Sequence, residues 1–346
     1  MEARYYEISE DMSQRLNILK FIFMAMVVFI HSEALPELPY ELEVPEYVSV
    51  CKNIATYGIC AIAVPGFFFV SGFLLFSKEF TWIENLKKKA RSLLLPYVLI
   101  NTFWILFFKG MQHFKTTAPY FAGENYQING FGGLLEAYLD PMPLYYPFWF
   151  LRELIILNLF AKAIIIIIDR MPVISFVVIV AFYFNIVQIP LLLSNDSFCM
   201  FSLSYYLVKY QWNVKKIDRV RCLHWGLAFG GAIAFKLWIW NHAITRLCYV
   251  AIGLCFFWQL AGRIRKGRLC KPILWCSQFS FFIYAFHEFF EAMLKKVVMT
   301  TLPQYGYVQL MEFFLIPTFI IAICIVAGAV TKKWIPAIYR LICGYR

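Results

Sequence analysis

The chain has 346 residues, of which 61% are hydrophobic and 15% are charged, and its mean hydropathy is +0.65. Soluble domains are nearer half apolar and a quarter charged, so this composition excludes an ordinary soluble domain. The net charge of +11 would suggest nucleic acid in a soluble protein. Here the basic residues cluster in short loops between apolar runs, where the positive-inside rule explains them. We therefore expect an all-α, polytopic membrane protein that binds no nucleic acid.

About ten apolar runs have the length of membrane spans. The first loop carries five glutamates between Glu33 and Glu46 and no lysine or arginine, so it should face outward. The second loop carries four lysines and an arginine between Lys78 and Arg91, so it should face the cytoplasm. The alternation continues along the chain, so the loop 214–221, with Lys215, Lys216, Arg219 and Arg221, should face the cytoplasm as well. We expect one domain, 1–346, with cytoplasmic ends at 1–17 and 332–346. The expected spans are 18–36, 55–76, 92–110, 145–168, 172–193, 198–213, 222–240, 247–262, 272–293 and 308–331.

Several common motifs are missing from the sequence. It contains no HExxH, Walker-type or GxGxxG signature, so neither ATP-driven transport nor dinucleotide chemistry has local support. The ten cysteines include no C-x-x-C pair, and most lie in or beside apolar runs. We expect them to be small packing residues and predict no metal site.

The first apolar run, KFIFMAMVVFIH, begins at Lys20 and ends at His31. A cation and a histidine are costly at membrane depth, so each is a functional candidate. On a helix they lie roughly 16 Å apart along the axis and within roughly 20° of one face. We expect His31 in the outer half of the membrane. The alternative is a structural histidine, hydrogen-bonded at a helix end.

A second histidine, His287, belongs to a polar stripe on an otherwise apolar helix. Ser280, Tyr284, His287 and Glu291 follow at i, i+4, i+7 and i+11 and so share one face. The predicted topology places His287 toward the outer leaflet as well, at the depth of His31. The alternative is a polar seam that holds helices together.

Three weaker features lie elsewhere in the chain. The basic run Lys87–Lys89 and Arg91 could bind an anion together with Lys20, although such a run most often only marks topology. Ser71-Gly72, within an aromatic run, would let a helix or a thin ligand chain approach the backbone closely. Arg152 and Glu153, near the start of the fourth span, could pair locally or face a water-filled cavity.

These features resemble the acyltransferase 3 family of integral-membrane O-acyltransferases. In that family the first span ends in Val-Val-x-x-His, with a basic residue ten intervening positions before the histidine; Val27–His31 and Lys20 match this pattern. The basic residue is usually arginine, and lysine keeps the charge but loses the bidentate fork. Four further segments resemble family motifs and follow in the family's order. They are Phe68–Leu74; Lys88 and Arg91, followed by Leu94–Tyr97; Trp149–Arg152; and Ser280 together with Tyr284 and His287.

The resemblance implies a membrane enzyme of the bacterial plasma (inner) membrane. It would move an acyl group, with acetyl expected, from cytoplasmic acyl-CoA to a hydroxyl of a surface polysaccharide or of its lipid-linked precursor. His31 would act as general base or carry the acyl group transiently. His287, with Tyr284 and Glu291 nearby, would orient His31 or the acceptor, or would stabilise the developing oxyanion. The residues implied to hold acetyl-CoA are Lys20, Lys88, Arg91, Ser71, Gly72 and Arg152.

Two other functions remain open from the residues alone. A transporter or flippase for a glycolipid or small anion would line a pathway with the same side chains. A membrane partner that positions a polymerase would need none of them for chemistry. Release of free thiol from acetyl-CoA in a reaction that depends on His31 separates the enzyme from both. The sequence does not indicate an oligomeric state.

Overall fold

The computed structural model describes residues 6–33, 42–78, 81–115, 117–118, 128, 130–140, 145–186, 193–239 and 242–345. These residues form helices and connecting turns, and they contain no β-strand. The α-helices are α1 Glu10–His31, α2 Glu46–Asn53, α3 Ala63–Phe76, α4 Trp82–Lys89, α5 Leu95–His113, α6 Gly130–Leu139, α7 Phe148–Arg170, α8 Pro172–Tyr183, α9 Asn195–Lys209, α10 Cys222–Ala234, α11 Ala243–Lys266, α12 Cys270–Ser277, α13 Ser280–Thr301, α14 Gly306–Trp334 and α15 Pro336–Ile342. Short π or 3-10 segments are η1 Ile54–Ile59, η2 Cys60–Ile62, η3 Ala90–Leu94, η6 Val214–Arg219 and η7 Phe235–Ile239.

The all-helical prediction is confirmed, and within the described residues six helical segments are long and apolar enough to cross a membrane. The other four predicted spans fall on α7, α8, α9 and α12–α13, so the number ten and the placement of the termini stay predictions. The six segments are Glu10–His31, Glu46–Phe76, Trp82–His113, Cys222–Ile239, Ala243–Lys266 and Gly306–Trp334.

Two predicted span boundaries differ from the helices observed. The first helix begins at Glu10 and ends at His31, so it starts within the segment that we expected to be cytoplasmic. Lys20 consequently lies near the middle of α1. The predicted ninth span, 272–293, was wrong as a single helix, because a turn at Gln278 and Phe279 separates α12 from α13. Most of the acidic first loop, 34–41, lies outside the described residues.

Two of the long helical segments contain irregular turns just before a proline. Pro65 cannot donate a backbone hydrogen bond and its ring crowds the preceding turn, and the π and 3-10 turns η1 and η2 lie directly before it. In the same way η3 precedes Pro96. Within η1 the backbone carbonyl oxygen of Gly58 accepts a hydrogen bond of 2.7 Å from the Tyr249 hydroxyl.

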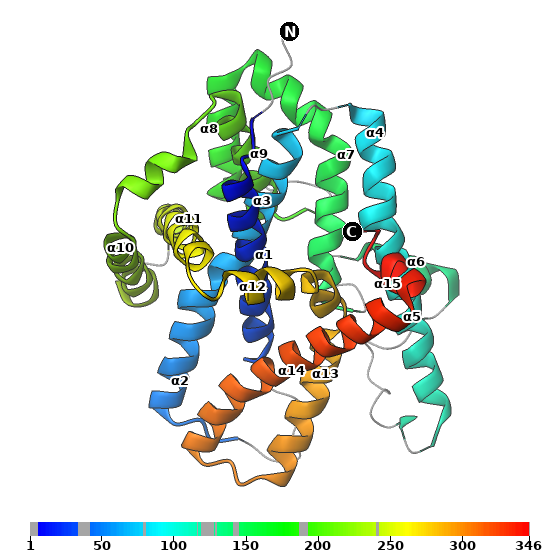
Figure 1. Ribbon diagram of the computed structural model, residues 1–346. Helices are drawn as coiled ribbons and strands as arrows, with labels where there is room; N and C mark the ends of the chain where they lie inside the picture. The colour runs from blue at the N-terminus through cyan, green and yellow to red at the C-terminus, as the bar shows by residue number, and fades with distance from the viewer. Residues whose placement is uncertain are drawn as a thin grey trace. The chain divides into compact units, whose positions relative to one another are not determined.

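The chain divides into two compact units, Met1–Glu79 with Met200–Ala329, and Phe80–Cys199 with Val330–Arg346. In the first unit α1 is the central helix and packs against α3, α11, α12 and α13 (Figure 1). In the second unit α7 packs against α4 and α8, and α5 packs against α6, α7 and α15. Both predicted histidines belong to the first unit, whereas Lys88, Arg91 and Arg152 belong to the second.

Candidate active site

The C-terminal end of α1 carries His31 and is held in place by α14. At its other end, α1 is capped by the Ser9 side chain and has two acidic residues in its first turn, which complement the helix dipole. Near His31 the ring of Phe29 meets that of Phe313 edge-on, at a centroid distance of 6.4 Å. The Ser32 hydroxyl donates to the backbone carbonyl of Phe313 at 3.3 Å. The last turn of α1 is therefore fixed from the side of α14.

The imidazole rings of His31 and His287 meet edge to face, with centroids 5.1 Å apart and planes at 67°. The side chain of His287 is fully buried. Its Nδ1 lies 3.0 Å from the carbonyl oxygen of Ile283 and 3.1 Å from that of Tyr284. A carbonyl oxygen only accepts, so Nδ1 carries the proton and Nε2 is left as an acceptor. Among the described residues Nε2 has no hydrogen-bond partner.

Glu288 faces the other histidine, with its Oε1 3.7 Å from His31 Nδ1. This residue is absent from the polar stripe that the sequence predicted, because it lies one position beyond His287. Successive residues on a helix point about 100° apart, so Glu288 lies to one side of the stripe to which His287 belongs. Glu288 could have been found from the sequence, because it directly follows His287 on a helix already assigned to the site.

Lys295 is a second residue that the sequence analysis missed. Its ammonium group donates to the Ser32 carbonyl oxygen at 2.5 Å and to that of His31 at 3.4 Å, and the residue is 6% exposed. Glu291, one turn earlier on α13, is buried and interacts electrostatically with Lys295. Lys295 follows Glu291 at i+4 and so continues the predicted stripe by one turn, which is the signal that could have found it.

The predicted donor-binding residues of the first unit lie along α1 and α3. Lys20 is partly buried and its ammonium lies 3.5 Å from the Asn17 side-chain oxygen. Gly72 is buried against α9, where an added Cβ would come within 2.7 Å of the Phe201 carbonyl oxygen. The sequence predicted that a helix or a ligand chain approaches the backbone closely at Ser71-Gly72. At Gly72 the neighbour is a helix, α9.

The predicted donor-binding residues of the second unit lie on α4, η3 and α7. Lys88 and Arg91 are exposed. Arg152 is buried and donates to the carbonyl oxygens of Leu139 and Asp140, at the end of α6. Its neighbour Glu153 accepts from Ser194, through the backbone nitrogen at 2.9 Å and the hydroxyl at 2.8 Å. Of the two possibilities given by the sequence, these contacts of Arg152 and Glu153 with nearby groups fit local pairing.

The described part of the chain contains no group of three or more His, Cys, Asp or Glu residues placed to hold a metal. What the site does contain is a basic nitrogen on each of two facing imidazoles, a carboxylate beside one of them and a buried ammonium behind the helix end. Such a set can remove a proton from a hydroxyl group without a metal.

A pair of facing histidines among helices long and apolar enough to cross a membrane fits a membrane-embedded enzyme of group transfer. The chain belongs to the acyltransferase 3 family, whose acyltransferase domain it matches over residues 13–331. It is therefore an acyltransferase and a multi-pass membrane protein, as the resemblance in the sequence predicted.

One relative among curated proteins is the succinoglycan biosynthesis protein ExoH of Rhizobium meliloti (strain 1021). The two chains are 22% identical over 353 residues, which cover 97% of this chain and 93% of the relative. No solved structure matches the chain significantly.

Proposed function

We propose that the enzyme transfers an acyl group, with acetyl expected, from cytoplasmic acyl-CoA to a hydroxyl of a surface polysaccharide or of its lipid-linked precursor. Membership of the acyltransferase 3 family supports acyl transfer. The name of the relative, a succinoglycan biosynthesis protein, supports a polysaccharide acceptor. The proposed location is the bacterial plasma membrane, with the donor entering from the inner side and the acceptor from the outer side.

His31 is the proposed general base. Its neutral imidazole takes the proton of the acceptor hydroxyl while that oxygen attacks the thioester carbonyl carbon. The new C–O bond forms, the C–S bond breaks, and the proton on His31 passes to the departing thiolate to give free coenzyme A. The histidine therefore returns to its neutral state in each cycle, and no external reductant or oxidant is needed.

The single observation that supports this role most strongly is the placement of Glu288 beside His31 Nδ1 at 3.7 Å. A carboxylate opposite Nδ1 favours the tautomer with the proton on that nitrogen, which leaves Nε2 as the basic atom. The distance exceeds that of a hydrogen bond, and such contacts often shorten only when substrate is bound. We assign Glu288 as the residue that orients His31.

His287 is proposed to orient the acceptor hydroxyl. Because its Nδ1–H is given to backbone carbonyls, neutral His287 offers a single acceptor atom, Nε2. An acceptor atom binds a hydroxyl hydrogen but does not stabilise an oxyanion, so the first of the roles suggested by the sequence fits the neutral ring better. Tyr284 supports this arrangement through its backbone carbonyl oxygen.

The donor is proposed to bind with its phosphates near the inner cations, as charge-assisted contacts. Lys20 lies eleven residues before His31 on the uninterrupted helix α1, which corresponds to roughly 16 Å. This span is of the same order as the length of a pantetheine arm. Lys88, Arg91 and Arg152 remain proposed donor contacts within the second unit.

The decisive experiment compares purified wild-type protein with the His31→Ala variant, using acetyl-CoA and an isolated glycan acceptor. We expect the variant to lose transfer while its yield and thermal unfolding midpoint in detergent stay normal. Transfer that persists in His31→Ala would refute the base. Flux of a glycolipid in wild-type protein without consumption of acetyl-CoA would instead support the transporter. Mass analysis of the surface glycan identifies the acceptor position and the acyl group.

A further inference from the structure

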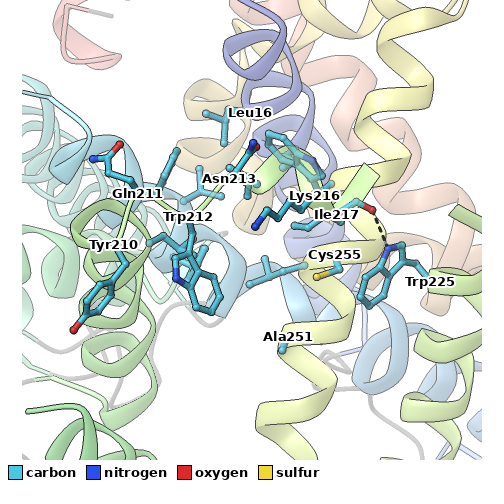
Figure 2. Close-up of a pocket in the computed structure, with 18 residues that line it drawn as sticks. Leu16, Tyr210, Gln211, Trp212, Asn213, Lys216, Ile217, Trp225, Ala251 and Cys255 are labelled. Atoms are coloured by element: carbon cyan, nitrogen blue, oxygen red, sulfur yellow. Dashed lines mark hydrogen bonds between the residues drawn. The ribbon is translucent and has the colours of Figure 1, made fainter. Parts of the chain in front are cut away.

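A cavity of about 800 Å³ lies in the first unit, at the end of the bundle opposite to His31 along α1. Its walls come from α1, α3, α9, α10, α11, η6 and the segment that leads into η6 (Figure 2). Most lining side chains are apolar, and three of them are tryptophans, Trp212, Trp225 and Trp258. The volume is in the range of pockets that enclose a drug-sized ligand.

One wall of this cavity is a short segment held by polar contacts. The carboxylate of Asp218, on η6, is 2.8 Å from Arg15, a buried residue of α1. The backbone carbonyl of Ile217 accepts from the Gln259 amide at 2.9 Å and from the Trp225 indole at 3.4 Å. Figure 2 shows this last bond at the edge of the cavity. The wall therefore has a defined position relative to α1 and α11.

The polar groups of the lining favour an anionic ligand with hydrogen-bond acceptors. Lys216 lies on η6, and Figure 2 shows its side chain between Trp212 and Cys255. The acidic residue of the same 3-10 helix, Asp218, is engaged by Arg15 and so does little to neutralise Lys216. The indole nitrogen of Trp258 is buried and has no hydrogen-bond partner among the described residues. Such a donor is costly unless a ligand supplies an acceptor.

We propose that this cavity binds the nucleotide portion of the coenzyme A donor. The flat, apolar adenine ring suits the indole side chains, on which bases stack. The phosphates suit Lys216 at the wall, as charge-assisted contacts. This inference rests on the proposed function and assigns a place to the adenine ring of the donor, for which the sequence motifs named no residue. The predicted cytoplasmic loop 214–221, which carries Lys216, lies on the side from which acyl-CoA would come.

One wall of the cavity belongs to α1, the helix that ends at His31, the proposed base. Leu16 and Leu19 line the cavity from α1, and Leu19 precedes His31 by twelve residues, or roughly 18 Å. From α3, Phe69, Val70 and Phe73 line it, on either side of Ser71-Gly72. A nucleotide bound here would direct its pantetheine arm along α1, in the direction of His31.

The test measures binding to the purified full chain in detergent, with two probes. The first probe is acetyl-CoA, and the second is adenosine 3′,5′-bisphosphate, which lacks the pantetheine arm and the thioester. Lys216→Glu should raise the Kd for both probes at least tenfold at low salt, and the effect should shrink as salt is added. The matched control is Lys215→Glu, the neighbouring exposed lysine, which does not line the cavity. It should change each Kd less than twofold.

A second variant tests the aromatic contact. Trp212→Ala removes an exposed indole without leaving a buried space. It should raise the Kd for both probes about fivefold or more. Equal Kd values for Lys216→Glu and Lys215→Glu would overturn the proposal that this cavity binds the donor. They would not affect the proposed acyltransferase function. A higher KM for the glycan acceptor with an unchanged donor Kd would overturn the proposal for this cavity too, in favour of an acceptor lipid. Failure of the wild type to bind acetyl-CoA would refute the proposed donor itself.

Discussion

The ammonium group of Lys295 lies 2.5 Å from the backbone carbonyl oxygen of Ser32, so a charge on α13 holds the C-terminal end of α1. The last carbonyl groups of a helix lack intrahelical partners and carry partial negative charge, which a lysine satisfies well. His31 precedes Ser32 directly. Lys295 therefore helps to set the position of the proposed base through hydrogen bonds to the backbone of His31 and Ser32.

Replacing Lys295 by methionine should lower both stability and activity. The change removes a charge-assisted hydrogen bond, worth about 1.5–3 kcal/mol, and leaves Glu291 buried without its cation. We expect a lower thermal unfolding midpoint in detergent and a reduced kcat with little change in the KM for acyl-CoA. Lys296→Met, the neighbouring residue, is the control and should be close to wild type.

The double variant Lys295→Met, Glu291→Gln separates the two causes of that loss. It removes the unpaired buried charge, so part of the stability should return, whereas the helix end remains untied and kcat should stay low. If kcat recovers together with the unfolding midpoint, Lys295 acts through stability alone and has no positioning role.

Glu288→Gln should lower kcat about 10²-fold or more, because an amide can present its NH₂ group to Nδ1 and so favour the wrong tautomer. The KM for acyl-CoA should not change, since Glu288 faces the imidazole. Steady-state kinetics with the glycan acceptor measure both constants. The exposed Glu84→Gln serves as control for the same chemical change. A Glu288→Gln enzyme within twofold of wild type would remove the assigned orienting role.

Gly72→Ala should destabilise the protein by about 1–3 kcal/mol, because its Cβ would meet the Phe201 carbonyl oxygen at 2.7 Å and backbone cannot easily yield. Gly230→Ala is a matched substitution within α10, where no atom lies within 4 Å of the added carbon. It should be neutral or stabilise by up to about 1 kcal/mol. Thermal unfolding of the two variants side by side measures the difference, and equal midpoints would contradict close packing at Gly72.

Arg15→Met should destabilise the end of the first unit that lies opposite to His31 along α1. Arg15 is 5% exposed, pairs with Asp11 and Asp218, and lies over the Trp258 ring at 5.0 Å. Asp218 is partly exposed, so we expect about 2 kcal/mol, which is less than the loss of a fully buried pair. A double-mutant cycle with Asp218→Asn should give a coupling energy of about 1 kcal/mol or more. Additive effects would show that the pair does not hold η6.

The sequence predicted the helical class, the family and the two histidines, since each of these follows from local pattern. The facing of His31 and His287 was expected only from their matched depth, and the structure adds the ring contact itself. Glu288 and Lys295 were missed for different reasons. Glu288 lies off the strict stripe, and Lys295 lies beyond the expected end of the span at 293, because the helix continues to Thr301.

The division of the predicted ninth span could not be read from hydropathy. The turn at Gln278 and Phe279 interrupts an apolar stretch without a proline or glycine to mark it. Arg15 was likewise overlooked, because it lies before the run that began the first predicted span. Asp11 is a local partner on α1, four residues earlier, but Asp218 and Trp258 reach Arg15 only through the packing of α1 with η6 and α11. Contacts of this kind between distant segments have no local sequence pattern.

Helix α1 is one continuous rod that borders the cavity through Leu16 and Leu19 and ends at His31. It therefore contributes one wall of the cavity and also carries the proposed base. A substitution at either leucine that shifts α1 along its axis would also shift the imidazole ring, because the residues of a regular helix are joined by continuous backbone hydrogen bonds.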